Sequence, residues 1–404
     1  MATTDPSTSD ASHDTPYKGL RVLDLGQGVA SPYCAMLMAL NGADVVKVEP
    51  PSGDWARRLG TMYGEHTALS AVYNRGKRDL CVDLKQAEGR RIVRELALRA
   101  DVLVEGFRPG VTAGLGLGYD DLKTDNPGLL YVSISGFGQV GPHAHRPCTD
   151  SVAQAFSGLV SLNKGTDGVP NRVGALISDV STGLYAYQAL ATALYARCRT
   201  GSGRLIDVSL TQATAALLGH KLAEHVLEGG QPRALNVPAG SYRTRDGWLV
   251  LTLVTEQQYK QLCTTLGCAE LIDDPRYNDF SRRADNAETL IARLQDIFLS
   301  NDTASWLQDL TPAGVLVERV FDPGDWLNDP HVVATQAAVA VATDGVGTVY
   351  VPRTPGAAPS SDHNLSQSPT RGQHNVQILE ELGIERSAID ELLASGVIHA
   401  ESSI

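Results

Sequence analysis

Residues 20–49 read LRVLDLGQGVASPYCAMLMALNGADVVKVE, and this stretch decides the fold. Its first six residues are mostly apolar and predict a short buried strand, and residues 31–43 predict a helix that Asn-Gly ends. DVVKVE, residues 44–49, predicts a second strand. Two strands joined by a helix within about thirty residues indicate a βαβ unit, so we expect parallel strands and a right-handed crossover.

The same alternation continues along the chain and predicts an α/β protein with a doubly wound parallel sheet in its N-terminal domain. Further strands are predicted at 79–83, 101–107 and 129–137, with helices at 86–99, 151–161, 180–197 and 211–228. A Gly- and Pro-rich stretch at 229–240 predicts a linker, and Asp-Gly within 241–253 predicts the turn of a β-hairpin in a smaller α+β domain. Beyond the hairpin, helices are predicted at 256–266, 281–300, 374–383 and 385–396, and strands at 314–320, 336–342 and 347–351.

The composition is that of a globular protein whose main partners are not polyanions. Of the 404 residues, 43% are hydrophobic and 20% are charged, and the formal net charge is −12. This acidity argues against nucleic acid and anionic membranes as partners. No window reaches eighteen apolar residues, so we expect no membrane span, and the polar first 16 residues predict a disordered tail rather than a signal peptide.

Several familiar site types are missing from the sequence. The six cysteines form no CxxC pair, a pattern typical of a reducing, cytoplasmic environment without disulfides or a zinc site. His143 and His145 form the one HxH pair, but no third ligand stands beside them, so no metal site is expected. There is neither a GxSxG elbow nor a Walker loop, which disfavours a serine hydrolase and an ATPase.

Three loops are candidates for ligand contacts. DLGQGVASP, residues 24–32, stands between a strand and a helix, where phosphate loops usually lie, but a tight turn is favoured over a nucleotide site. NRGKRDL, residues 74–80, carries three cations and is interpreted as a solvated basic turn, with an anion-binding corner as the alternative. In EGFRPG, residues 105–110, Arg108 follows a strand at its carboxyl end and is the stronger candidate for a ligand contact.

Two aspartates stand near predicted helix starts. Thr149 or Asp150 is expected to cap the helix at 151–161, and Asp179 is expected to cap the helix at 180–197. For Asp179 the capping role is the simplest interpretation that the residues alone support.

Taken together, these segments resemble the family III CoA-transferases, the group that contains formyl-CoA:oxalate and carnitine CoA-transferases. The stretches that carry the resemblance begin with GLRVLDLGQGVASPYCAMLMALNGADVVKVEPPSGD and include NRGKRDLCVDLKQAEGR, ADVLVEGFRPGV, NPGLLYVSISGFGQVGP, DSVAQAFSGL, DVSTGLYAYQALATALYARCRTGSGRLIDVSL and GQHNVQILEELGI. They follow the family's order over nearly the whole chain after residue 17.

The resemblance implies a fold, a domain division and an assembly. It implies a large Rossmann-like domain built from both ends of the chain, here residues 18–228 and 325–404, after a disordered tail at 1–17. It places a small domain at 229–324 and implies a homodimer whose two chains interlock.

It also implies a reaction and its residues. Asp179 takes the place of the family's nucleophile, which forms a mixed anhydride with an acyl group and then a thioester with CoA. Asp150 matches an acidic position beside the active site. The positions that match CoA contacts are Val29, Ala30, Val82, Asp83, Leu84, Lys85, Gly106, Phe107 and Arg108. The substrates are an acyl-CoA and a carboxylic acid, and no metal, ATP or tightly bound cofactor is needed.

Departures from the pattern narrow this expectation. The related α-methylacyl-CoA racemases carry a His where Thr149 stands, so racemisation here lacks one of its acid/base partners. Formyl-CoA:oxalate transferases carry a glutamine where Val29 stands and a glycine-rich loop that 236–242 lacks. A C4–C5 dicarboxylate, an aromatic acid or a carnitine-like acid therefore fits better than oxalate. An acyl-CoA isomerase or racemase, a CoA-ester lyase, and a CoA-ester-binding protein remain as alternatives.

Overall fold

A computed structural model describes residues 15–165, 168–230, 236–357 and 365–399. The chain divides into two compact units, Met1–Gly219 with Gln336–Ile404, and His220–Thr335. Of the stretch 1–17, for which a disordered tail is expected, residues 1–14 lie outside the described residues, whereas the Tyr17 N–H donates to the Asn41 carbonyl. Part of the expected linker, 231–235, also lies outside the described residues.

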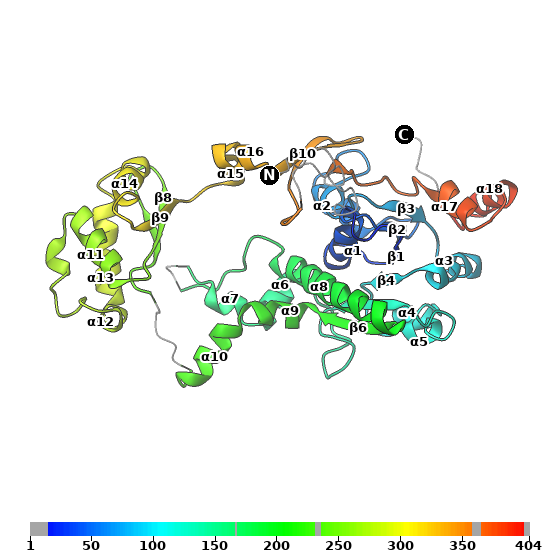
Figure 1. Ribbon diagram of the computed structural model, residues 1–404, viewed down its shortest axis with the longest axis horizontal. Coiled ribbons are helices and arrows are strands. Elements are labelled where there is room, and N and C mark those ends of the chain that lie inside the picture. Colours follow the sequence, from blue (N-terminus) through cyan, green and yellow to red (C-terminus); the bar gives the residue numbers. More distant parts are fainter. Residues whose placement is uncertain (1–14, 166–167, 231–235, 358–364, 400–404) are drawn as a thin grey trace, which may run out of the picture. The chain divides into compact units, whose positions relative to one another are not determined.

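The first unit is built on a six-stranded sheet in which every pairing is parallel, as predicted (Figure 1). Its strands are β1 (Arg21–Asp24), β2 (Asp44–Glu49), β3 (Arg78–Cys81), β4 (Val102–Glu105), β5 (Leu130–Ser135) and β6 (Arg204–Ser209). Their order, β3-β2-β1-β4-β5-β6, reverses between β1 and β4. In a doubly wound sheet, that reversal opens a crevice at the carboxyl ends of the strands, where ligands bind.

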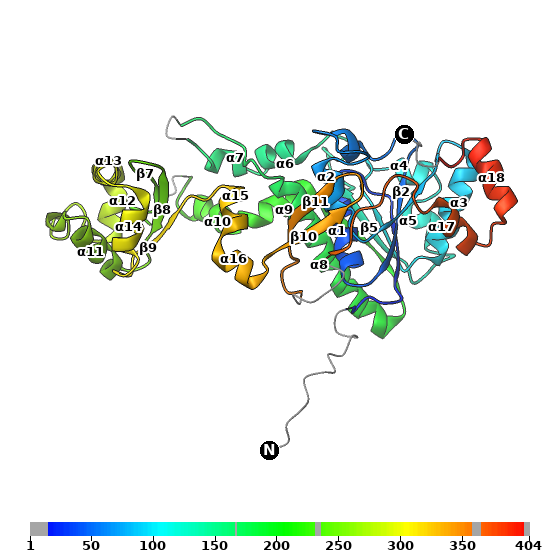
Figure 2. The same cartoon turned by 90° about the horizontal axis from the view of Figure 1, so that it is seen from above.

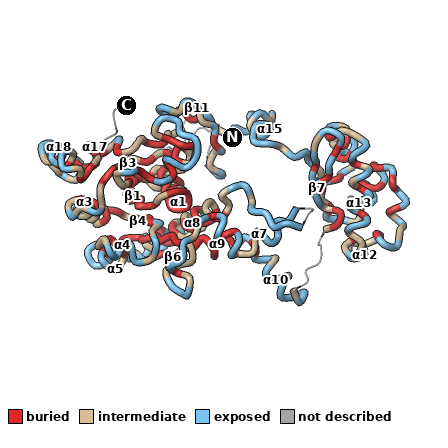
Figure 3. The backbone as a smooth tube through the Cα atoms, turned by 180° about the vertical axis from the view of Figure 1, so that it is seen from behind, coloured by how far each residue is buried: buried red, intermediate tan, exposed pale blue. Residues whose placement is uncertain are grey.

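Helices cover both faces of this sheet (Figures 1 and 2). On one face, α3 (Ala87–Arg99), α17 (Asn375–Glu381) and α18 (Arg386–Ala394) pack through residues such as Ile92, Ile378 and Ile389. On the other, α1 (Ala30–Leu40) and α8 (Ile177–Thr200) pack through residues such as Met38 and Leu190. The strands between the two layers are almost wholly buried (Figure 3). The α/β class predicted from the alternation of strands and helices is confirmed.

The remaining elements of this unit follow the same order along the chain. Its helices are α1 (Ala30–Leu40), α2 (Ala68–Tyr73), α3 (Ala87–Arg99), α4 (Val111–Gly114), α5 (Tyr119–Leu122), α6 (Asp150–Phe156), α7 (Leu159–Leu162), α8 (Ile177–Thr200), α9 (Leu210–Leu217), α17 (Asn375–Glu381) and α18 (Arg386–Ala394), with a 3-10 helix at Trp55–Arg58. The strands β10 (Ala338–Thr343) and β11 (Gly347–Pro352) form an antiparallel hairpin.

The second unit has its own core around a three-stranded antiparallel sheet. Its strands are β7 (Gly240–Arg243), β8 (Trp248–Thr252) and β9 (Leu316–Arg319), and its helices are α11 (Glu256–Thr265), α12 (Phe280–Asp285), α13 (Ala287–Phe298), α14 (Thr303–Leu310), α15 (Pro323–Asn328) and α16 (Pro330–Thr335), with a 3-10 helix at Ala269–Leu271. Helix α10 (Gly219–Leu227) begins at the division. The predicted hairpin turn is confirmed, because Asp246 and Gly247 lie between β7 and β8, which pair antiparallel.

Buried ion pairs hold the loop between β1 and α1. Lys77 Nζ lies 2.8 Å from Asp24 Oδ2 and also donates to the Pro32 carbonyl, and Lys47 Nζ lies 2.9 Å from Asp54 Oδ2. Each of these four charged side chains is fully buried. The interpretation of 74–80 as a solvated basic turn is therefore wrong. Lys77 points into the protein and binds the loop between β1 and α1, because a buried ammonium group requires a carboxylate partner.

Helix α8 begins earlier than predicted. It starts at Ile177, and Leu176 is its N-cap residue, so Asp179 is the third helical residue rather than the cap. The side chain of Leu176 makes no capping hydrogen bond. A residue distant in sequence supplies the cap instead, as described below, and this allows the helix to extend by one more turn. At the other end, Gly201 ends the helix with a φ of 72°.

The C-terminal segment packs against the edge of the sheet. Ser368 Oγ donates to the Ser70 carbonyl, which ties this segment to α2. Ile398 forms an antiparallel bridge with Val82, and the His399 N–H donates to the Cys81 carbonyl. The end of the described chain thus lies beside the carboxyl end of β3.

Candidate active site

Two aspartates meet at the N-terminus of α8. Asp150, the first residue of α6, accepts hydrogen bonds through Oδ1 from the N–H groups of Ser178 at 2.7 Å and Asp179 at 3.2 Å. These are donors that a local cap residue normally satisfies. Thr149 occupies the N-cap position of α6, as one of the two expected alternatives, but its side chain makes no capping hydrogen bond. The other candidate, Asp150, caps α8 instead of its own helix.

The Asp179 carboxylate itself has a different environment. Within the part of the chain that the structure describes, no hydrogen bond or ion pair reaches it, although the side chain is partly buried in the first turn of α8. Burial, together with the negative charge of Asp150, raises its pKa to about 7. A carboxylate that lacks donors is a stronger nucleophile once ionised than one that is bonded to several.

Other groups near this carboxylate do not compensate its charge. Burial is the first cause of the raised pKa of Tyr73, followed by the charges of Tyr33, Asp179 and Asp150. Burial likewise raises the pKa of Cys148 to about 11, with Asp179 as the next cause. Both groups are therefore neutral near pH 7, and Asp150 and Asp179 form the ionisable pair of the site.

The first turn of α1 lies directly against α8. A Cβ atom on Gly183 would lie 2.8 Å from the Ala30 carbonyl oxygen, so only glycine lets the two backbones approach this closely. Gly183 stands one helical turn after Asp179, on the same face of α8. Val29 is the N-cap residue of α1 and is buried, as is Ala30. The structure thus brings the predicted residues Val29 and Ala30 to the helix that carries Asp179.

A cavity of about 600 Å³ opens at the carboxyl ends of β1 to β4, at the reversal of strand order. Its lining is mostly apolar and comes from the loops that follow these four strands and from the C-terminal segment. The residues are Leu25, Gln27, Val48, Pro50, Pro51, Ser52, Asp83, Leu84, Lys85, Phe107, Leu115, Gly396 and His399. A cavity of this size suits a nucleotide-sized ligand.

Only some of the predicted CoA contacts line this cavity. Asp83, Leu84, Lys85 and Phe107 do so, and Lys85 is exposed at the rim. Three others lie next to these residues but outside the lining: Val82 is in the core beneath it, and Gly106 and Arg108 are exposed on either side of Phe107.

Sequence reasoning missed the contribution of the chain end. Gly396 and His399 line the cavity although they lie more than 300 residues from Leu84. Pairing of the C-terminal segment with the edge of β3 brings them there. Pro50 and Pro51 were also missed, although their position directly after a predicted strand could have indicated them.

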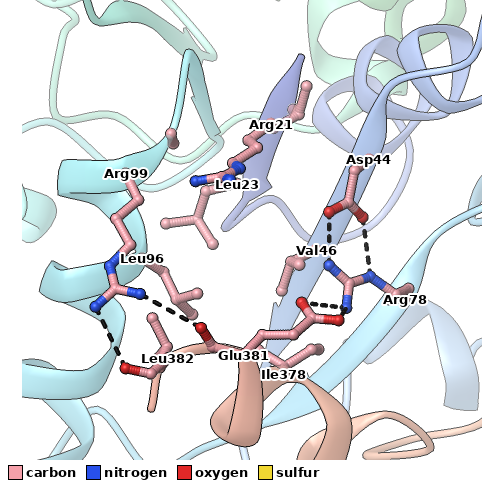
Figure 4. Close-up of a pocket in the computed structure, with 12 residues that line it drawn as sticks. Arg21, Leu23, Asp44, Val46, Arg78, Leu96, Arg99, Ile378, Glu381 and Leu382 are labelled. Atoms are coloured by element: carbon pink, nitrogen blue, oxygen red, sulfur yellow. Dashed lines mark hydrogen bonds and ion pairs between the residues drawn. The ribbon is translucent and has the colours of Figure 1, made fainter. Parts of the chain in front are cut away.

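A second cavity, of about 470 Å³, lies at the opposite, amino-terminal edge of the sheet (Figure 4). Three arginines line it, yet Arg78 is bound to both Asp44 and Glu381, at 2.6 and 2.8 Å. Arg99 donates to the carbonyl oxygens that end α17. These guanidinium groups hold α17 and the strand edge together, and the first cavity remains the better candidate for a substrate.

Two further searches concern metals and membranes. The described residues contain no group of three or more His, Cys, Asp or Glu side chains placed to hold a metal ion. None of the described helices is both long enough and apolar enough to cross a bilayer.

These features define a doubly wound α/β protein with a carboxylate pair beside its first βα loop. The sequence profile of CoA-transferase family III matches residues 17–375. Succinyl-CoA:glutarate CoA-transferase of Mus musculus is 36% identical over 405 residues, which cover 96% of this chain and 92% of that protein. Acetyl-CoA:oxalate CoA-transferase of Acetobacter aceti is also 36% identical, over 81% of this chain and 86% of its own length.

Solved structures agree with this assignment. A CaiB/BaiF family protein from Brucella suis superposes with a TM-score of 0.81 at 33% identity, covering 91% of this chain and all of that one. The chain belongs to CoA-transferase family III, and it is a CoA-transferase. The resemblance identified from the sequence motifs is confirmed.

Proposed function

We propose that the protein transfers CoA from an acyl-CoA to a free carboxylic acid through covalent intermediates on Asp179. The observation that carries this proposal is the Asp179 carboxylate, which is partly buried and has no hydrogen bond or ion pair among the described residues. It lies on the helix that packs against Ala30, at the end of the loop whose Leu25 and Gln27 line the cavity.

The proposed reaction conserves the activated acyl bond at each step. An Asp179 oxygen attacks the thioester carbonyl, the C–S bond breaks, and CoA leaves as a thiolate from a mixed anhydride. The thiolate attacks the aspartyl carbonyl and releases the donor acid. The acceptor carboxylate then attacks this aspartyl-CoA thioester, and the expelled thiolate takes the acceptor acyl group from the second anhydride. Neither water nor a nucleoside triphosphate is consumed.

The remaining site residues receive roles in this scheme. The CoA moiety occupies the cavity at the strand reversal, with Lys85 at the rim facing its phosphates and Phe107 against its apolar surface. Arg108, Gly106 and Val82 shape the same wall from outside the lining. Backbone N–H groups at Val29 and Ala30 face the developing oxyanion, because the first turn of a helix presents donors without intrahelical partners.

We propose a dicarboxylic acid as the acceptor, with succinyl-CoA and glutarate as the first pair to test. The printed name of the mouse relative supports this choice, and that relative matches 96% of this chain. The name of the bacterial relative makes oxalate the comparison acid. Transfer to oxalate at least as efficient as transfer to glutarate would contradict the expectation of a C4–C5 acid.

We further propose that the protein is an interlocked homodimer, which the family resemblance implies. Large apolar side chains on α8 and α10 support an interface, since Tyr195, Val226 and Leu227 are 69%, 77% and 84% exposed. Light scattering on the purified protein should give twice the mass of the chain, and a monomer would contradict the proposal.

Mass spectrometry tests the covalent route. The protein is mixed with succinyl-CoA, trapped with hydroxylamine or borohydride, and its peptides are mapped. A modification on Asp179, absent from Asp179→Asn and retained in the matched variant Asp302→Asn, is the expected result. Measurable CoA-ester binding without any adduct at Asp179 would contradict the mechanism and favour an isomerase, a lyase or a binding protein.

A further inference from the structure

Gln154 lies behind the aspartate pair and is fully buried. Its Nε2 donates to Asp150 Oδ2 at 2.6 Å, on the carboxylate oxygen that faces away from α8. Its Oε1 accepts from the Val173 N–H at 2.8 Å, and Nε2 also lies 3.4 Å from the carbonyl oxygens of Val173 and Ala175. One amide thus joins α6 to the segment that enters α8.

These contacts fix both oxygens of Asp150. Oδ2 is held by Gln154, and Oδ1 is held by the N–H groups of Ser178 and Asp179. The helix donors that would otherwise stabilise an ionised Asp179 are therefore occupied by its neighbour. The charge of Asp150 also stays close to the Asp179 carboxyl, where it opposes ionisation.

We propose that Gln154 is a positioning residue, which holds Asp150 across the first turn of α8 and thereby keeps the Asp179 carboxylate without donors. Its effect on catalysis rests on the proposed function, but its effect on the Asp179 carboxyl does not. Without Gln154, Asp150 can turn away from α8, which frees the helix N–H groups and favours ionisation of Asp179.

The ionisation of Asp179 can be used to measure the effect of Gln154, because the other titratable groups that face Asp179, apart from Asp150, keep their charge in the same pH range. Asp150 faces it from α6, Tyr73 from α2, and Cys148 from the segment before α6. The pKa values of the phenol and the thiol are raised, so neither group changes its charge between pH 5 and 9. A shift in this range therefore reports on the two aspartates.

The test is carbodiimide labelling of Asp179 as a function of pH, quantified by peptide mass spectrometry in the full-length protein. Carbodiimide reacts with the protonated carboxyl, so the labelling midpoint follows the ionisation of Asp179 and requires no catalysis. In Gln154→Met we expect the midpoint to move to lower pH by about one unit. Gln188→Met, on the exposed side of α8, is the matched control and should keep the wild-type midpoint.

A double-mutant cycle shows whether Gln154 acts through Asp150. Asp150→Asn should move the midpoint in the same direction, and adding Gln154→Met to it should produce no further shift. Equal and additive shifts, or an unchanged midpoint in Gln154→Met, would overturn the proposal. Gln154→Asn, which keeps the amide but shortens its reach, provides a second variant with the same expected shift if the methionine variant does not fold.

Kinetics separates this proposal from the proposed function. At pH 8, Gln154→Met should lower kcat by about tenfold while KM for the acyl-CoA stays within about twofold. The N–H groups that Asp150 releases would stabilise the Asp179 anion and weaken it as a nucleophile, whereas the CoA cavity is untouched. A shifted midpoint with no acyl adduct on wild-type Asp179 would refute the covalent route and leave this role standing. An adduct with an unshifted midpoint would do the reverse.

Discussion

Two aspartates of this protein stand at helix N-termini, Asp179 in the first turn of α8 and Asp302 at the N-cap of α14. Asp302 is the N-cap residue of α14 and accepts the Ser305 N–H at 2.8 Å. That bond is the first cause of its lowered pKa. Asp179 lies three residues inside α8, its donors are taken by Asp150, and its pKa is raised to about 7.

The difference shows that the environment of a carboxylate at a helix start sets the direction of its pKa shift. A carboxylate that receives the free N–H groups is stabilised as an anion and serves the helix. A carboxylate that does not receive these N–H groups keeps its lone pairs available, and burial raises its pKa toward neutral pH. In α8, Asp150 accepts the N–H groups of the first turn, and no printed bond among the described residues reaches the Asp179 carboxylate.

The largest expected effect is on transfer activity. Asp179→Asn should lower CoA transfer by at least about a thousandfold, because an amide cannot form the anhydride. Asp302→Asn should retain activity within about twofold, since asparagine also caps a helix. Initial rates with succinyl-CoA and glutarate provide the measurement, and substantial activity in Asp179→Asn would remove this residue from the mechanism.

The pH dependence is the next effect. The nucleophile must be ionised, and the pKa of Asp179 is raised to about 7, so kcat/KM should rise with pH through about 7. Asp150→Asn removes a negative charge, which should move this rise to lower pH by about one unit. Rates of both proteins from pH 5 to 9 test the shift. If kcat/KM rises over the same pH range in both proteins, Asp150 does not influence the ionisation of Asp179.

Asp179→Asn, which should abolish transfer activity, should at the same time raise the thermal stability of the protein. The pKa of Asp179 is raised from 3.8 to about 7 in the folded state, so the folded protein binds more protons in this interval and loses stability as pH rises through it. Asp179→Asn should therefore raise Tm by about 2–4 °C at pH 8 and by much less at pH 4. Thermal melts at both pH values measure this, and an equal effect at both would contradict the sign.

The smallest effect is expected at Asp302. Its lowered pKa means that its contribution is present above the ordinary aspartate pKa and is lost as pH falls through the folded value. Asp302→Ala should lower Tm by about 1–2 °C at pH 7 and by less as the pH falls below the ordinary aspartate pKa. A rise in Tm at pH 7 would place Asp302 in the same class as Asp179.

Much of the fold could be predicted because it is encoded locally. The apolar runs at β1, β2 and β4 and the intervening helices follow from periodicity, and Asp-Gly at 246–247 marks its hairpin directly. The motif around Asp179 could be matched to a family because its residues are contiguous. Helix boundaries were less accurate where, as at α8, the cap is not local.

The sequence by itself determined the α/β class, the parallel strands, the family and the identity of the carboxylate in the first turn of α8. Only the tertiary structure decided that Asp150 caps that helix, that Lys77 is buried against Asp24, and that His399 reaches the cavity. The reason is physical. Periodicity and turn chemistry act over a few residues, whereas the partner that stabilises a buried charge or a free N–H group is chosen by packing, and here it lies 28 or more positions away.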